Sequence, residues 1–205
     1  MRRRNTGYVL LALLVVTGLA GTISGSISGK ERKAVISLMK ETRGDVLKST
    51  KGLSEAQLDF KASADQWSAK ECVYHIAVSE NNLWQWLEAA LKSPANPEKR
   101  SEIKTTDEEI IKMTENRSNK VKTSEQLEPK SAPYKSLDDA LADFKDKRAK
   151  HIQYLKVTTE DLRDHIVQGP FGWIDCYQLC LLIAAHSNRH TQQINEIKTN
   201  AAYPK

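Results

Sequence analysis

The segment 176–185 constrains the fold more than any other, because it is apolar almost all round and continues with helical periodicity to about Thr199. A helix that is hydrophobic around its whole circumference must be buried among other elements. Three further segments carry apolar residues at helical spacing, namely 30–50, 68–93 and 136–156, and no segment shows the alternation of a strand. The sequence therefore predicts an all-α fold, a four-helix bundle whose last helix begins at Trp173 and is the most buried.

Capping boxes mark three helix starts. In such a box a Ser or Thr side chain and a Glu three residues later satisfy each other's backbone N–H groups. The pairs are Ser28 with Glu31, Ser68 with Glu71, and Thr106 with Glu109. The third pair predicts a short extra helix to about Val121, between the second and third main helices. The stretches 53–67 and 157–172 are expected to be connections, the first with a short turn.

The first 29 residues have the pattern of a secretory signal peptide. Arginines at positions 2–4 precede an apolar run, Tyr8–Ala20, and small polar residues follow it. The run is shorter than the ~20 residues that a membrane span needs. We therefore expect an exported protein, periplasmic or extracellular, with residues 1–29 as signal peptide and linker and 30–205 as the bundle domain. A short uncleaved membrane anchor is the alternative.

The net charge of +5 comes largely from these N-terminal arginines. Without them, 28 Lys and Arg residues stand against 26 Asp and Glu residues. The two signs are interspersed, and no basic stripe could follow a phosphate backbone. Nucleic acid is therefore not an expected partner.

The last predicted helix carries His186 and His190, one turn apart on one face. At 100° per residue, both lie on the apolar stripe of Leu179, Leu182 and Ile197. Buried imidazoles must be hydrogen-bonded or bound to something. Metal ligation is one explanation, and a pair of core histidines bonded to backbone or water is the other.

His75 lies beside the apolar stripe of the second helix. Its own face carries Glu71, Cys72, Ser79 and Trp86, a mixture of polar and aromatic groups. This composition fits a pocket wall, and it also fits a half-exposed histidine with polar neighbours. Glu71 could serve as a general base near His75, although its capping role already accounts for it.

Two runs of the sequence resemble the signatures of the DinB/YfiT-like superfamily. One is WSAKECVYHI at 67–76, and the other is HSNRHTQQI at 186–194. The resemblance extends over residues 30–205. It implies an up-down-down-up bundle in which His75, His186 and His190 hold one divalent metal ion, zinc or nickel, with open coordination positions. Dimers occur in this superfamily, so a homodimer is a further implication.

The three cysteines give little sign of a disulfide. Cys176 and Cys180 are four residues apart on one helix, which suits disulfide geometry poorly. In the implied antiparallel arrangement, Cys72 lies over ~15 Å along the axis from Cys180. We expect no disulfide at Cys72 and at least one free thiol. Cys72 itself is either a packing residue beside Trp67 or a fourth metal ligand.

Three other polar residues are weaker candidates. Gln193 lies on the stripe of the paired histidines, where it could support a ligand or could be an amide at the core edge. His151 lies near the apolar stripe of the third helix and is expected at the edge of the core. His165 is expected in a loop.

These features favour a metal-dependent enzyme acting on a small molecule. No Gly-x-Ser-x-Gly motif is present, so the expected chemistry is hydrolysis by metal-activated water. The family resemblance also implies thiol-dependent S-transferases, but low-molecular-weight thiols are mainly cytosolic and the signal peptide argues against them. A non-catalytic protein that binds metal or a small ligand is the other alternative.

Overall fold

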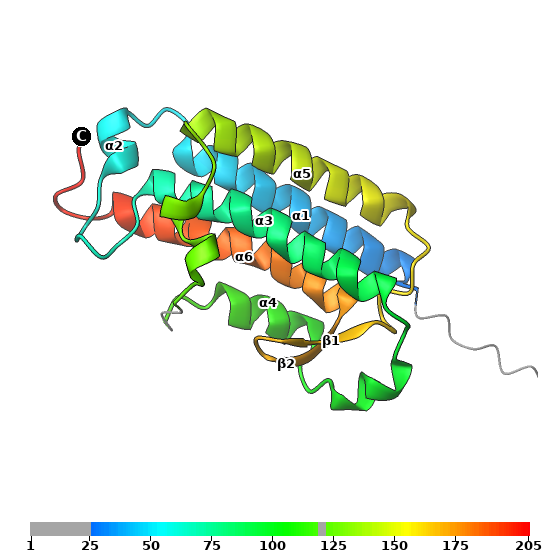
Figure 1. Cartoon of the computed structure of the whole chain (residues 1–205). Coiled ribbons are helices and arrows are strands. Elements are labelled where there is room, and N and C mark those ends of the chain that lie inside the picture. Colours follow the sequence, from blue (N-terminus) through cyan, green and yellow to red (C-terminus); the bar gives the residue numbers. More distant parts are fainter. Residues whose placement is uncertain (1–25, 119–121) are drawn as a thin grey trace, which may run out of the picture.

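The computed structural model describes residues 26–118 and 122–205, and its main body is a bundle of four long helices (Figure 1). These helices are α1 (Gly29–Thr50), α3 (Ala69–Lys92), α5 (Leu137–Val157) and α6 (Cys176–Lys198). Both α1 and α3 pack against α5 and α6, so α1 and α3 occupy opposite corners. As Figure 1 shows, α1 and α6 run in one direction and α3 and α5 in the other. The predicted up-down-down-up bundle is confirmed.

All three predicted capping boxes form. In α1 and α3, Ser28 and Ser68 accept hydrogen bonds from the backbone N–H groups three residues later, and the glutamates reciprocate. Thr106 does the same for α4 (Asp107–Glu115). A fourth box, Asp175 with Gln178, opens α6. In the first connection, the expected turn is the short helix α2 (Glu55–Asp59).

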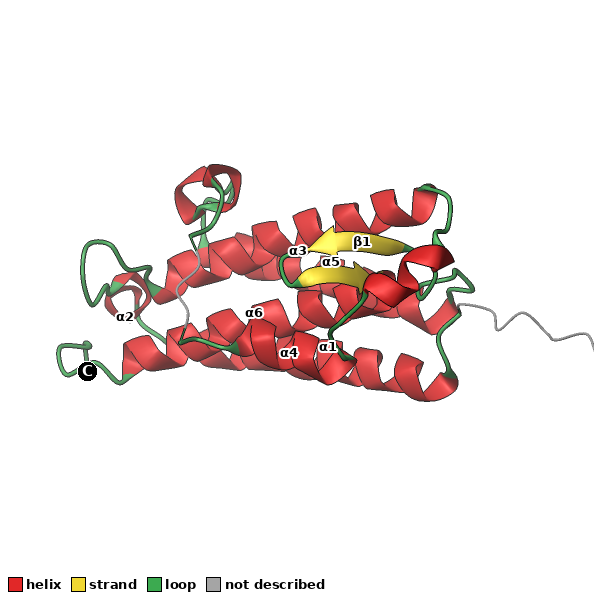
Figure 2. Ribbon diagram, turned by 90° about the horizontal axis from the view of Figure 1, so that it is seen from below, coloured by secondary structure: helices red, strands yellow, loops and turns green. Residues whose placement is uncertain are grey.

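The connection from α3 to α5 crosses back along the bundle, because these two helices are parallel. It contains the 3₁₀ turns η1 (Pro97–Glu102), η2 (Glu125–Leu127) and η3 (Pro129–Ser131) besides α4. Helix α4 lies against α6 (Figure 2). The turns η2 and η3 lie against α3. The connection therefore touches both helices that carry the candidate histidines.

The predicted end of the extra helix at Val121 is wrong. Helix α4 ends at Glu115, and Asn116 takes an extended conformation. The Asn116 side chain accepts a hydrogen bond from the backbone N–H of Ser118, 2.8 Å away. This local bond gives the chain an alternative to another helical turn. Val121 itself lies outside the described residues.

A small hairpin replaces part of the expected loop. Strands β1 (Ile166–Gly169) and β2 (Gly172–Asp175) pair antiparallel, with Gly169 opposite Gly172. The expectations of no strand and of a helix from Trp173 are therefore wrong at this point. Helix α6 starts only after its cap Asp175, which leaves the preceding residues free to pair with β1. Gly172 closes the turn with a positive φ of 101°, which side chains disfavour.

Helix α6 is the most buried helix of the bundle, as predicted, with buried residues from Cys176 almost without interruption to Ala185. It packs against α1, α3 and α4 at once. Of the described helices, none is both long and apolar enough to cross a membrane. The predicted signal segment falls almost wholly within residues 1–25, outside the described residues.

Candidate metal centre

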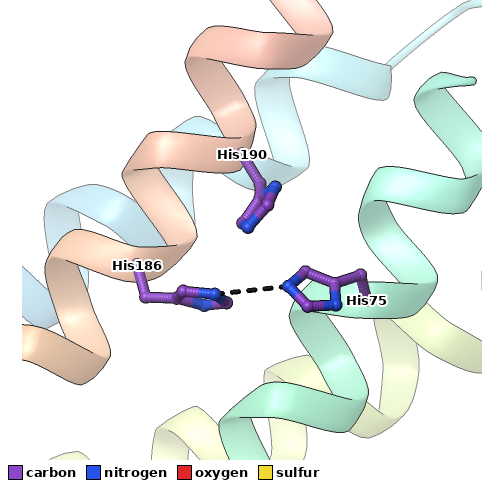
Figure 3. Close-up of side chains that lie close together, drawn as sticks. All are labelled: His75, His186 and His190. Atoms are coloured by element: carbon purple, nitrogen blue, oxygen red, sulfur yellow. Dashed lines mark hydrogen bonds between the residues drawn. The ribbon is translucent and has the colours of Figure 1, made fainter. Parts of the chain in front are cut away.

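The bundle brings His75 of α3 together with His186 and His190 of α6. One nitrogen from each ring lies within 4.8 Å of the other two (Figure 3). His75 and His190 are buried, and His186 is partly exposed. No carboxylate or thiol of the described residues belongs to this group. His186 and His190, four residues apart on α6, therefore lie next to His75 of α3. In the sequence, only the family resemblance connected His75 with this pair.

The nitrogen spacing suits a single ion. Nε2 of His75 lies 3.3 Å from Nε2 of His186. Two nitrogens bound to one zinc ion at about 2.0–2.1 Å with tetrahedral angles are about 3.3 Å apart. The ring centroid of His190 lies 4.4 Å from that of His75 and 4.7 Å from that of His186. Three imidazoles in this arrangement are a donor set that fits zinc or nickel.

Hydrogen bonds orient two of the rings. Nδ1 of His75 lies 2.7 Å from the carbonyl oxygen of Leu127. Since a carbonyl only accepts, Nδ1 donates, and the lone pair is left on Nε2. Nδ1 of His190 lies 3.1 Å from Oε1 of Gln193. Of the two roles predicted for Gln193, the structure therefore supports the first, in which it orients a candidate ligand, His190.

Electrostatics keeps the three rings neutral. Burial lowers the pKa of His75, and burial together with the neighbouring His75 lowers the pKa of His186 to about 3. Burial, followed by the two other rings, lowers the pKa of His190 well below its ordinary value. Only a neutral imidazole has a lone pair for a metal ion. The site is thus prepared for a cation at neutral pH.

The three histidines line one wall of a cavity of about 1010 Å³. Helix α4, the connection that follows it, the hairpin turn and the loop before α3 supply its other walls. Apolar side chains in the lining include Leu83, Met113 and Phe171. The cavity is large enough for a small-molecule ligand beside the histidines.

Aromatic and polar neighbours complete the surroundings of His75. The Trp67 ring lies 4.7 Å from the His75 ring and 5.9 Å from the His190 ring, measured between centroids. Ser79 Oγ lies 3.4 Å from His75 Nε2. Glu71 is occupied by its capping role and by an ion pair with Lys61. His75 belongs to a pocket wall and is not half-exposed.

All three cysteines are free and buried, in agreement with the predicted absence of a disulfide at Cys72. Cys72 packs in the core with Val73 and Ile194 and is not among the grouped donors. Burial raises the pKa of its thiol. Packing, rather than ligation, is the role that the structure gives Cys72.

The bundle also buries a second polar group that was not predicted, the Glu80–Arg148–His151 cluster. Arg148 donates from Nε and Nη2 to the two carboxylate oxygens of Glu80, at 2.7 and 2.6 Å. His151 Nδ1 lies 2.7 Å from Glu80 Oε1, and the ring stacks on Trp84 at 3.8 Å between centroids. His151 therefore belongs to an ion-pair cluster rather than to the three-histidine site.

A signal for this cluster was present in the sequence. Glu80 follows Ile76 by four residues on α3, and Arg148 follows Phe144 by four residues on α5. Each charge thus falls on an apolar stripe, where a charge must be paired. His165, expected in a loop, does lie between α5 and β1, but it is buried, with its ring nitrogens near the carbonyls of Asp161 and Ser93.

Comparisons with known proteins agree with this architecture. The chain is 25% identical over 170 residues to the uncharacterized protein YuaE of Bacillus subtilis (strain 168), a match that covers 80% of this chain and 96% of YuaE. Its fold is similar to that of YfiT from Bacillus subtilis, described as a probable metal-dependent hydrolase with an unusual four-helix bundle topology. That match has a TM-score of 0.59 and 16% identity, and covers 87% of this chain and 92% of YfiT. The profile of the DinB superfamily matches residues 38–194, and the chain belongs to this superfamily.

Proposed function

We propose that this protein is a metal-dependent hydrolase of a small molecule, with His75, His186 and His190 holding one divalent ion. One observation carries the proposal. Three neutral imidazoles converge on the wall of a cavity of about 1010 Å³, and no fourth protein donor joins them among the described residues. Three protein ligands beside an open cavity are the pattern of a catalytic site, whereas structural zinc sites are closed by four.

The ion would act as a Lewis acid, able to polarise a substrate oxygen and to lower the pKa of water. Zinc and nickel are the proposed metals because imidazole suits both. The similarity of the fold to YfiT, described as a probable metal-dependent hydrolase, supports the same reaction class.

The chain's own residues would orient the site and its substrate. Leu127 and Gln193 hold the Nδ1 protons of His75 and His190, so that both Nε2 lone pairs remain available. Leu83, Met113 and Phe171 would accept an apolar part of the substrate and exclude water from it.

Elemental analysis of the purified protein is the first test. We expect about one equivalent of zinc or nickel in the wild type and its loss in His186→Ala and His190→Ala. His151→Ala is the matched control, because it also removes a buried histidine but lies in the other cluster. Retention of stoichiometric metal in both site variants would show that the ligands lie elsewhere.

Activity assays separate the proposed reaction from its alternatives. The metal-loaded protein is screened with ester, amide and phosphoester substrates, with and without an added low-molecular-weight thiol. Hydrolysis that is absent from His186→Ala supports the proposal. Turnover only with thiol would indicate an S-transferase, and metal binding without any turnover would favour a non-catalytic binder.

We also propose that the protein is exported, on the pattern of its first 29 residues. Cell fractionation followed by mass spectrometry of the intact protein tests this. A mature chain that lacks the apolar run, found outside the cytoplasm, is expected. A full-length chain in the membrane fraction would indicate an uncleaved anchor.

A further inference from the structure

The connection between α3 and α5 reaches the candidate metal centre at two points. Leu127 in η2 contributes its carbonyl oxygen to His75. Arg117, two residues after the end of α4, reaches α6 near His190. Leu127 binds Nδ1 of His75 directly, whereas Arg117 binds the Gln193 amide that contacts Nδ1 of His190. In both rings, the other nitrogen is the one left for the metal site.

Arg117 shares an acceptor with His190. Its Nη1 donates to Oε1 of Gln193 at 3.2 Å, and His190 Nδ1 lies 3.1 Å from the same oxygen. Arginine has only donors, so the amide atom that faces Arg117 must be the oxygen. The contact with Arg117 thereby selects one of the two orientations of the Gln193 amide. Without such a neighbour, a glutamine side chain could take either orientation.

The orientation of the amide determines the tautomer of His190. An oxygen next to Nδ1 can only accept, so the proton is on Nδ1 and the lone pair on Nε2. Figure 3 shows one ring nitrogen of His190 pointing toward the other two rings. If the amide turned over, its NH₂ group would donate to Nδ1 and favour the proton on Nε2, which could then bind no metal.

Glu196 holds Arg117 in place. Its Oε1 and Oε2 accept hydrogen bonds from Nε and Nη2 of Arg117, at 3.3 and 2.9 Å. Such a two-point contact orients the guanidinium plane as well as attracting its charge. Gln193 lies three residues after His190 and three residues before Glu196 on α6, so it is a surface neighbour of both. The third guanidinium nitrogen, Nη1, is left directed at Gln193.

We propose that Arg117 is a positioning residue for metal binding: held by Glu196, it fixes the Gln193 amide so that His190 presents Nε2 to the metal site. The inference rests on the proposed three-histidine site. It assigns a role to the long connection, whose α4 end supplies a group that acts on a ligand 73 residues further along the chain. Glu196 binds Nε and Nη2 of Arg117, and Nη1 binds Gln193, so Arg117 acts on His190 through the Gln193 amide.

The test compares Arg117→Met with Arg100→Gln. Arg100 lies in the same connection and pairs with Asp164, at 2.6 Å, so its loss controls for a general effect on this segment. Zinc affinity of the metal-free proteins is measured by competition with a chromogenic chelator. We expect a loss of about 10–100-fold in Arg117→Met, the usual cost of removing a group that orients a ligand. Arg100→Gln is expected to match the wild type.

A rescue variant distinguishes orientation from mere packing. In Arg117→Met with Gln193→Glu, a carboxylate replaces the amide and presents an acceptor to His190 whichever way it turns. This double variant is expected to recover most of the lost zinc affinity. A loss in Arg117→Met that Gln193→Glu fails to rescue would assign Arg117 a structural role and overturn the proposal, as would wild-type affinity in Arg117→Met.

Long-range ¹H–¹⁵N spectra of the metal-free protein test the tautomer without any metal. We expect the Nδ1–H form of His190 in the wild type and a substantial Nε2–H population in Arg117→Met. The same tautomer in both proteins would refute the role of Arg117. Failure of the wild type to bind metal would refute the proposed function instead, while these spectra would still decide the positioning role.

Discussion

Two groups of histidines inside this bundle have different kinds of partner. In the three-histidine site, the pKa of every ring is lowered, no carboxylate of the described residues joins the group of ring nitrogens, and nitrogens of separate rings face one another beside a cavity. In the Glu80–Arg148–His151 cluster, the histidine contacts a carboxylate that a buried arginine already grips. The remaining guanidinium donors of Arg148 reach Thr42, Ser187 and two backbone carbonyls.

The partners of a histidine in the bundle, and not its burial alone, decide which role it can take. The Glu80 carboxylate contacts Nδ1 of His151 and is also bound by Arg148, so the polar groups of this cluster bind one another. The cluster joins α1, α3, α5 and α6 by bonds that leave few polar atoms for a ligand. In the other group, the acceptors at Nδ1 of His75 and of His190 leave converging Nε2 lone pairs, to which a single cation can bind.

Among single substitutions, the largest effect should come from Arg148→Met, which breaks the Glu80–Arg148–His151 cluster. Arg148→Met leaves the Glu80 carboxylate buried without its cation, and we expect a loss of about 3–5 kcal/mol in the free energy of unfolding. Urea denaturation of the metal-free protein measures it. The double variant Glu80→Leu with Arg148→Met should regain most of the loss, since it leaves no unpaired charge. A loss in Arg148→Met as small as that of an exposed ion pair would contradict this view of the cluster.

Acid should distinguish the two groups by their pH windows. The pKa of each site histidine is lower in the folded protein than the ~6.5 of an unfolded chain, so the unfolded state binds protons first as the pH falls. Between pH 6.5 and 4.5, the metal-free protein should lose up to about 1.4 kcal/mol of unfolding free energy per pH unit for each histidine that stays neutral.

The Glu80–Arg148–His151 cluster should respond only at lower pH. Burial alone would raise the pKa of Glu80, but Arg148 and His151 bring it down to about 2 from 4.5. The stability that this carboxylate contributes is therefore present above pH 4.5 and lost as the pH falls toward 2. Urea unfolding at a series of pH values measures both windows. A slope between pH 6.5 and 4.5 that survives in His186→Ala with His190→Ala would assign it to other groups.

The smallest effect should come from Cys72. Cys72→Ala removes one buried sulfur beside Val73 and Ile194, for which we expect about 1 kcal/mol of lost stability and no change in metal stoichiometry or affinity. Denaturation and elemental analysis measure the two quantities. Metal loss in this variant would make Cys72 a fourth ligand and turn the open site into a closed one.

Much of the bundle could be predicted from local patterns. Capping boxes at Ser28, Ser68 and Thr106 involve groups three residues apart, so the sequence displays both partners together. The spacing of His186 and His190 is likewise a property of one helix. Their union with His75 required the family resemblance, because no local pattern relates α3 to α6.

The errors of prediction occurred where a local signal competed with a distant one. The helix pattern that begins beside segment 172–175 predicts a loop and helix there, but pairing with 166–169 and the Asp175 cap make this segment a strand. Glu80 and Arg148 are 68 residues apart, and each by itself looks like an ordinary charge on a helix. Their pairing is visible only when α3 and α5 are side by side.

The helices, their caps, the apolar stripe of α6 and the two histidines on it could all be predicted from sequence, since they depend on residues within one or two helical turns. Which nitrogen His75 and His190 present depends instead on groups that the fold brings close from distant parts of the chain. The Leu127 carbonyl has no side-chain signature, and the contact of Arg117 with Gln193 spans 76 residues. The orientation of these rings depends on which distant segments the fold brings together, and the hydrophobic periodicity of the sequence does not show that.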